Sequence, residues 1–145
     1  MQMNQDFLEF IKLLNIHNAE YVVIGAYARS FYGRPRYTGD IDFFISTSRE
    51  NAERMMRVLN DFGFGSLGIS IDDFMTPGQT IQLGVEPRRI DLLTGISGVE
   101  FRDAWKNRES IVIDGVAIQF ISREDFIRNK KASGRHKDLA DIEDM

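Results

Sequence analysis

Three aspartates in two short apolar segments carry the residue types that could do chemistry. Asp40 and Asp42 stand one residue apart in Thr-Gly-Asp-Ile-Asp-Phe-Phe-Ile, and Asp91 lies in Arg-Ile-Asp-Leu-Leu. Side chains alternate along a strand, so the first two carboxylates are expected on one face, about 7 Å apart along the backbone. Carboxylate oxygens at this spacing suit a hard divalent cation such as Mg²⁺.

Two carboxylates on one strand face repel each other when they leave water, so they require a cation, a raised pKa or open solvent. If a neighbouring strand brings Asp91 to the same place, the three acids suit metal-assisted phosphoryl transfer. In that chemistry metal ions neutralise the phosphates and one carboxylate accepts the proton of the nucleophile. Aspartates are also common in solvated turns and at strand edges, and spacing alone leaves this second interpretation open.

The segment before the acidic pair could bind an anion. Residues 21–24 (Tyr-Val-Val-Ile) form an unbroken apolar run typical of a strand buried on both faces, and Gly25 ends it. A short helix is predicted over 26–32, so the backbone N–H groups at Gly25 and Ala26 can hold a phosphate. Ser30, about one helical turn further along, is another candidate for the same site.

Hydrophobic periodicity predicts the other elements. Segment 65–78 contains turn signals and at most one helical turn, and Asp114-Gly115 predicts a hairpin turn. The remaining predicted helices cover 5–14, 49–62, a stretch that starts after Ser122 and ends near Gly134, and a stretch that starts at Lys137; the remaining predicted strands cover 41–45, 80–85, 89–93, 111–114 and 116–121. Without a repeat or linker, residues 1–145 are predicted to form one small α/β (α+β) domain.

Composition excludes several classes of protein. The 145 residues are 43% hydrophobic, enough for one core, and the absence of cysteine excludes disulfides and thiolate metal sites. With 18 basic and 22 acidic residues the net charge is −4, which argues against broad electrostatic capture of nucleic acid or anionic lipid. The sequence shows no signal peptide and no span of bilayer length, so we expect a cytoplasmic protein without membrane partners.

Several motifs in order along the chain resemble the signature of the DNA polymerase β-like nucleotidyltransferase superfamily. They are Ile-Gly-Ala-Tyr-Ala at 24–28, Gly-Arg-Pro-Arg-Tyr-Thr-Gly-Asp-Ile-Asp-Phe at 33–43 and Ile-Asp-Leu-Leu at 90–93. The ending, residues 126–142, is similar to the tail of small bacterial nucleotidyltransferase-like proteins, including those related to the AbiEii toxin type. The resemblance covers nearly the whole chain.

For this chain the resemblance implies a mixed β-sheet flanked by helices, with the Gly25 turn touching the triphosphate of a nucleotide such as ATP. It implies that Asp40, Asp42 and Asp91 hold two Mg²⁺ ions, for which Mn²⁺ can substitute, and that Asp91 is the general base. The implied reaction is attack by an acceptor hydroxyl on the α-phosphate of a nucleoside triphosphate, which releases pyrophosphate. The acceptor would be a protein, an RNA or a small molecule.

Basic residues provide further candidates. Arg36 lies just before the acidic pair, and the resemblance suggests that the tail folds back so that Lys131, Arg135 or Lys137 contacts phosphates. Cations near a helix C-terminus also complement the helix dipole, so this second interpretation stays open. Arg29 is expected on a solvated face.

One departure from the family pattern supports a rival function. The family usually has Gly-Gly or Gly-Ser where this chain has Gly25-Ala26, so a hydroxyl is missing although the backbone N–H remains. The alternatives are therefore a non-catalytic nucleotide-binding or regulatory module, or one component of a bacterial toxin-antitoxin system. The acceptor surface could then come from a homodimer mate or from a partner protein.

Overall fold

Short β-branched and aromatic segments form the strands of one mixed sheet in the computed structural model, which describes residues 3–33, 39–134 and 142. Within these residues the strands are β1 (Tyr21–Ile24), β2 (Ile41–Ile45), β3 (Thr80–Leu83), β4 (Ile90–Leu93), β5 (Glu109–Ile113) and β6 (Val116–Phe120). Their order across the sheet is β3-β4-β2-β1-β6-β5. The central strands β1 and β2 are therefore shielded by neighbours on both edges.

The register of the central strands aligns the candidate residues. β2 pairs antiparallel with β1 and parallel with β4, and β1 also pairs parallel with β6. Ile24 lies opposite Asp42 across the first pairing, and Asp42 lies opposite Asp91 across the second. The end of β1 and the two acids therefore form one row across the sheet.

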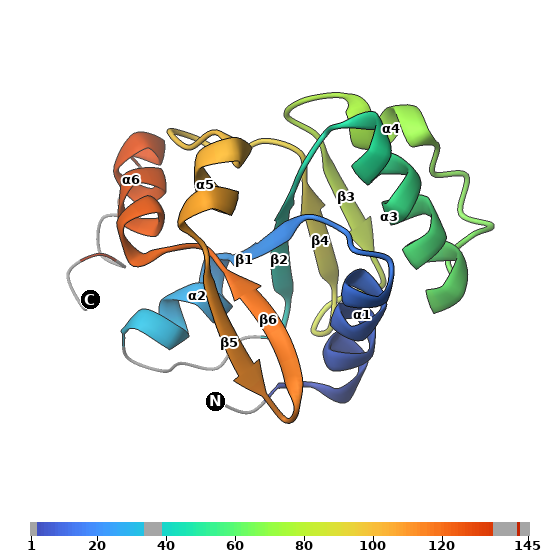
Figure 1. Cartoon of the computed structure of the whole chain (residues 1–145), viewed down its shortest axis with the longest axis horizontal. Helices are drawn as coiled ribbons and strands as arrows, with labels where there is room; N and C mark the ends of the chain where they lie inside the picture. The colour runs from blue at the N-terminus through green and yellow to red at the C-terminus, as the bar shows by residue number, and fades with distance from the viewer. Residues whose placement is uncertain (1–2, 34–38, 135–141, 143–145) are drawn as a thin grey trace.

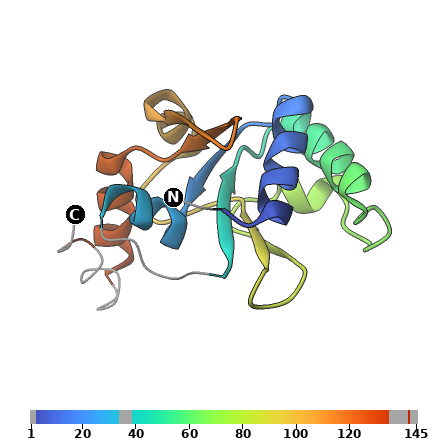
Figure 2. The ribbon, with the colours of Figure 1, turned by 90° about the horizontal axis from the view of Figure 1, so that it is seen from below.

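Helices cover both faces of this sheet. Within the described residues they are α1 (Gln5–Ile16), α2 (Gly25–Tyr32), α3 (Arg49–Phe62), α4 (Ile71–Met75), α5 (Phe101–Asn107) and α6 (Arg123–Ser133). Helices α1, α3 and α4 lie on one side of the sheet, and α2, α5 and α6 lie on the other (Figures 1 and 2). Serine N-caps start two of them, because Ser48 accepts a hydrogen bond from the backbone of α3 and Ser122 from that of α6.

Adjacent residues of β2 pack on opposite faces. The ring of Phe43 contacts Phe10 of α1 at a centroid distance of 5.6 Å, and the ring of Phe44 contacts Phe101 of α5 at 5.1 Å. Side chains alternate along a strand, so Asp42 points to the same side as Phe44. The acid therefore faces the layer that contains α5 and α6.

Most predicted elements are confirmed. The predicted bounds of strands 21–24 and 41–45 and of helix 49–62 agree with β1, β2 and α3, and the hairpin turn at Asp114-Gly115 joins β5 to β6. The predicted fold class, a mixed sheet flanked by helices, is also confirmed. The predicted helix that starts at Lys137 lies outside the described residues. None of the described helices combines the length and apolar character needed to cross a bilayer.

Two expectations about helices need correction. Arg29 was expected on a solvated face, but it is only 5% exposed because α2 packs against β1, β2 and α6. The sequence predicted no helix over α5, whose seven residues span too few turns to show a helical period.

Candidate active site

Two carboxyl groups meet where β2 and β4 pair. Asp42 and Asp91 are cross-strand neighbours in the parallel register, so their carboxyl groups lie close together. Burial, followed by the charge and hydrogen bond of Asp91 and then the charge of Asp40, raises the pKa of Asp42 to about 7. The raised pKa of Asp42 is one of the three ways in which facing carboxylates reduce their repulsion.

The β1–α2 turn lies directly against Asp42. Gly25, the first residue of α2, has a φ of +69°, and a Cβ at this position would overlap Asp42 Oδ2. Only glycine combines this backbone conformation with such a close approach. The N-terminus of α2 lies beside Asp42, and among the described residues no side chain caps its backbone N–H groups.

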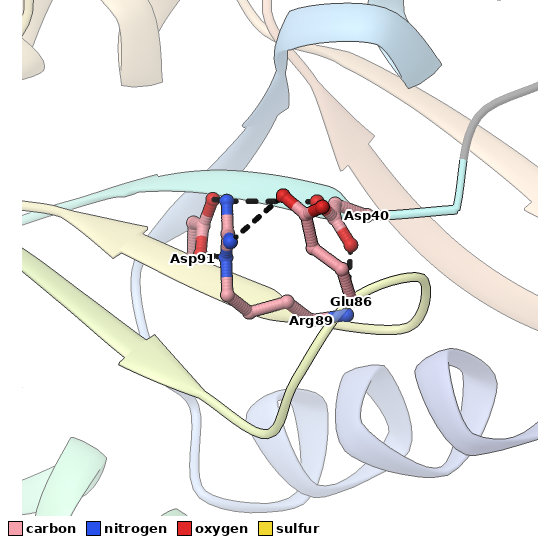
Figure 3. A network of polar contacts seen from close by, with 4 residues as sticks. All are labelled: Asp40, Glu86, Arg89 and Asp91. Atoms are coloured by element: carbon pink, nitrogen blue, oxygen red, sulfur yellow. Dashed lines mark hydrogen bonds and ion pairs between the residues drawn. The ribbon is translucent and has the colours of Figure 1, made fainter.

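Arg89 links the remaining acids (Figure 3). Its Nε lies 2.7 Å from Asp91 Oδ1 and its Nη2 lies 3.1 Å from Asp91 Oδ2, which is a bidentate ion pair. The same Nη2 lies 3.5 Å from Asp40 Oδ2, and the Arg89 backbone N–H donates to Asp40 Oδ1 at 2.9 Å. On its outer side, Nη1 lies 3.0 Å from Glu86 Oε1.

Sequence reasoning missed Arg89. The available signal was its position two residues before Asp91, because residues i and i+2 of a strand point to the same face. The hydrogen bond to Asp91, with the charges of Asp91, Asp40 and Glu86, raises the pKa of Arg89, so its guanidinium stays charged.

A cavity of about 470 Å³ opens on this row of residues between the sheet and α6. Its walls are formed by Ile24, Gly25, Asp42, Leu93, Gly95, Ile96, Ser97, Asn129, Lys130 and Ser133. The positive charge of Lys130 lowers the pKa of Asp42 and opposes the larger effect of burial. The cavity wall thus combines the carboxyl group of Asp42, the N-terminus of α2 and a lysine.

Helix α6 is attached to the loop after β4. The Asn129 side-chain amide donates to the Ser97 carbonyl at 2.9 Å, and a Cβ at Gly98 would overlap that of Ala132. This close contact sets the rotation of α6, which brings Lys130 to the cavity.

A family model described as a nucleotidyl transferase of unknown function (DUF2204) matches residues 3–145. The chain belongs to this family. The matched range contains every candidate residue of the site, from Gly25 to Lys137. No curated protein matches the sequence at a significant level.

The predicted site residues of this nucleotidyl transferase family member do not all gather in one place. Gly25 and Asp42 line the cavity, and Asp40 and Asp91 adjoin them through Arg89. Ala26 and Ser30 are half-buried but lie outside the cavity wall, and Lys131 is exposed. Arg36, Arg135 and Lys137 lie outside the described residues.

The structure adds detail on Ser30 of α2 and on the adjacent lysines Lys130 and Lys131 of α6. The Ser30 hydroxyl is buried and has no hydrogen-bond partner among the described residues. Lys131 is exposed, whereas Lys130, one residue earlier, lines the cavity. Of the two tail lysines in the described residues, Lys130 is therefore the one that the structure brings to the cavity.

The donor set fits a divalent cation at one position. Two facing carboxyl groups beside an open cavity are the oxygen ligands that Mg²⁺ prefers, and a cation there would relieve the repulsion that raises the pKa of Asp42. Asp40 is turned toward Arg89. In the described part of the chain, no three acidic or histidine side chains are already arranged as ligands of one metal ion.

Proposed function

We propose that the protein is a divalent-metal-dependent nucleotidyltransferase, which transfers a nucleoside monophosphate from a nucleoside triphosphate to a hydroxyl acceptor. The observation that carries the proposal is the meeting of Asp42, Asp91 and the Gly25 turn at the edge of one cavity that Lys130 also lines. Paired carboxylates, a helix N-terminus and a lysine are the groups that phosphoryl transfer uses for metal and phosphate.

The acids would hold the metal. Asp42 and Asp91 supply carboxylate oxygens for Mg²⁺ or Mn²⁺, and Asp40 would join them to complete a two-ion set, as the resemblance implies. When bound, the metal would neutralise phosphate charge and make the α-phosphorus more open to attack.

The protein's own groups would orient the substrate. Backbone N–H groups at Gly25 and Ala26 would bind phosphate oxygens, and the Lys130 ammonium would add positive charge on the opposite wall. Asp91 would take the proton of the acceptor hydroxyl while that oxygen bonds to the α-phosphorus. The bond from the α-phosphorus to the oxygen that bridges it to the β-phosphate would break, and pyrophosphate would leave with the bonding electron pair.

The size and walls of the cavity support a nucleotide-sized ligand. Its volume of about 470 Å³ lies inside the range of small-molecule sites, roughly 300–1,000 Å³. Ile24, Leu93 and Ile96 give it apolar walls, and Ser97 and Asn129 add polar groups. An apolar wall with a few polar groups suits a base and ribose.

A non-catalytic nucleotide-binding module is the second candidate, and Arg89 favours it. The bidentate pair already gives both Asp91 oxygens a cationic partner, and Ala26 brings no hydroxyl to the Gly25 turn. The similarity of residues 126–142 to AbiEii-related tails would place such a module in a toxin-antitoxin pair, with a partner protein as its target.

Calorimetric titration distinguishes these two functions. ATP, GTP, CTP and UTP are titrated with Mg²⁺ into the wild type, into an Asp40→Asn, Asp42→Asn double variant, and into an Asp103→Asn, Asp114→Asn double variant. The last is a charge-matched control, because both of its aspartates are exposed and lie outside the cavity wall.

Each outcome assigns the site. Mg²⁺-dependent binding that persists in the control and is lost in the first double variant supports the transferase, and pyrophosphate release with a pool of hydroxyl acceptors completes the test. Binding that does not depend on metal and survives the loss of both aspartates supports the non-catalytic module. No binding of any triphosphate rejects both functions for the isolated chain.

A further inference from the structure

Arg89 occupies the position of a cation among the acids (Figure 3). Its guanidinium contacts both oxygens of Asp91, reaches Asp40 and is held from outside by Glu86. Arginine presents its donors in a rigid planar fork, so this contact restricts the orientation of the Asp91 carboxylate as well as neutralising it.

The contacts of Arg89 compete with those of a metal ion. A divalent cation between Asp42 and Asp91 needs lone pairs of the Asp91 oxygens, and those oxygens accept the hydrogen bonds of Arg89 at 2.7 and 3.1 Å. A guanidinium and a metal ion on the same carboxylate also repel each other. Arg89 and a metal ion therefore oppose each other's binding at Asp91.

The guanidinium has a route out of the site. The Arg89 side chain is 23% exposed and the Glu86 side chain, in the turn between β3 and β4, is 67% exposed, whereas that of Asp91 is 9% exposed. Arg89 can therefore rotate toward solvent and keep Glu86 as a partner, while Asp91 stays within the sheet.

We propose that Arg89 is the built-in counter-ion of this site: it positions Asp91 and Asp40 while no metal is bound, and a divalent cation binds by displacing it from Asp91. The inference rests on the proposed function only in that the acids bind metal. It adds that Arg89, a positioning residue, sets the metal affinity of the site. Either the guanidinium or the divalent cation is bound at Asp91, so metal entry exchanges one cation for the other.

Direct Mn²⁺ binding tests the exchange without nucleotide or acceptor. Free Mn²⁺ is measured by electron paramagnetic resonance, and heat by calorimetry, for the wild type, Arg89→Gln and Arg88→Gln. The last is the matched control, because Arg88 is the exposed neighbour in the same turn and its loss changes the net charge equally. A nearby cation changes the proton affinity of a carboxylate by roughly 10- to 1,000-fold, so we expect Arg89→Gln to bind Mn²⁺ at least about tenfold more tightly than Arg88→Gln.

Thermal unfolding gives a second readout. Without metal, Arg89→Gln should melt at a lower temperature than Arg88→Gln, because the acids then face one another without a cation. Mn²⁺ should raise the melting temperature of Arg89→Gln more than that of the control, and a variant that folds only with Mn²⁺ supports the inference equally. Arg89→Lys, which keeps the charge and loses the fork, should lie between wild type and Arg89→Gln in affinity.

Failure of this inference differs from failure of the proposed function. Equal or weaker Mn²⁺ binding by folded Arg89→Gln, relative to Arg88→Gln, overturns the role of Arg89 and leaves the transferase standing. Tighter binding by Arg89→Gln without any nucleotide binding keeps the exchange and rejects the transferase. Absence of Mn²⁺ binding in every variant overturns both.

Discussion

Polar side chains lie at both ends of the β1–β2 pair, but their hydrogen-bond partners and charges differ. At one end the Asn51 side chain accepts from the Glu20 backbone N–H at 2.7 Å and donates to the carbonyls of Glu20 and Ser46 at 3.1 and 2.9 Å. At the other end Asp42 faces Asp91 beside a cavity. The first end is neutral and satisfied, whereas the second collects like charges.

This difference separates a structural polar group from one prepared for a ligand. The amide of Asn51 matches the donors and acceptors of the strand ends, so it fixes β1 against β2 and uses both of its N–H donors there. The acids at the opposite end keep unfavourable interactions that a cation would relieve. Strain of this kind is tolerated where the surrounding sheet is rigid.

The largest effect on the free energy of unfolding is expected at the Asn51 end of the β1–β2 pair. Asn51→Ala leaves buried backbone groups of Glu20 and Ser46 without partners, so we expect the free energy of unfolding to fall by about 2–4 kcal/mol. Urea denaturation of both proteins at pH 7 measures it. Asp42→Asn, at the opposite end, should cost less than about 1 kcal/mol or stabilise the protein. A larger loss for Asp42→Asn than for Asn51→Ala would show that the Asp42 carboxyl, and not the Asn51 amide, stabilises the fold more.

The pH dependence of stability is the next largest effect. The folded-state pKa of Asp42 is raised to about 7, so protonation of Asp42 stabilises the folded protein. This stabilisation is fully present below the unfolded-state pKa near 4 and is lost as pH rises through 7. Unfolding free energies of wild type and Asp42→Asn at pH 5, 6, 7 and 8 isolate this group. The variant should gain on the wild type as pH rises, by on the order of 2 kcal/mol, because one like charge disappears. A constant difference between the two proteins would mean that Asp42 titrates normally.

A smaller effect measures the contact between the Gly25 turn and Asp42. Gly25→Ala places a methyl group on Asp42 in a backbone with φ of +69°. Gly63→Ala, at φ of +97° with open space around its Cβ, carries the backbone strain alone. By chemical denaturation we expect Gly25→Ala to cost about 1–2 kcal/mol more than Gly63→Ala. Equal losses of unfolding free energy in the two variants would show that the Asp42 side chain moves aside without cost.

The smallest effect compares two adjacent lysines of α6. Lys130→Met removes a charge from the cavity wall, whereas Lys131→Met removes the same charge from an exposed position. We expect Lys130→Met to weaken triphosphate binding by roughly 3- to 10-fold, and Lys131→Met by less than about 2-fold, because exposed charges are screened by solvent. Calorimetric titration of the preferred triphosphate compares them. A larger loss of binding for Lys131→Met than for Lys130→Met would mean that α6 presents Lys131, and not Lys130, to the cavity.

Much of the architecture could be predicted from local patterns. The β-branched run at 21–24, the Asp-x-Asp pair and the hairpin turn at Asp114-Gly115 each have a period or turn chemistry that spans only a few residues. Helix α5 had no such signal, and the burial of Arg29 depends on the covering of α2 by β1, β2 and α6. Burial by distant segments has no local pattern.

The sequence alone was enough to locate most of the strands, to place Asp42 and Asp91 in two of them with Asp40 just before the first, and to predict the glycine after β1. The three-dimensional fold was needed to show that the parallel register sets Asp42 opposite Asp91, that Arg89 pairs with the acids, and that Lys130 rather than Lys131 lines the cavity. Strand periodicity assigns a side chain to a face, but the partner across the sheet depends on long-range pairing. One residue rotates a helical side chain by about 100°, so contact of α6 with the loop at Ser97 and Gly98 selects the lysine.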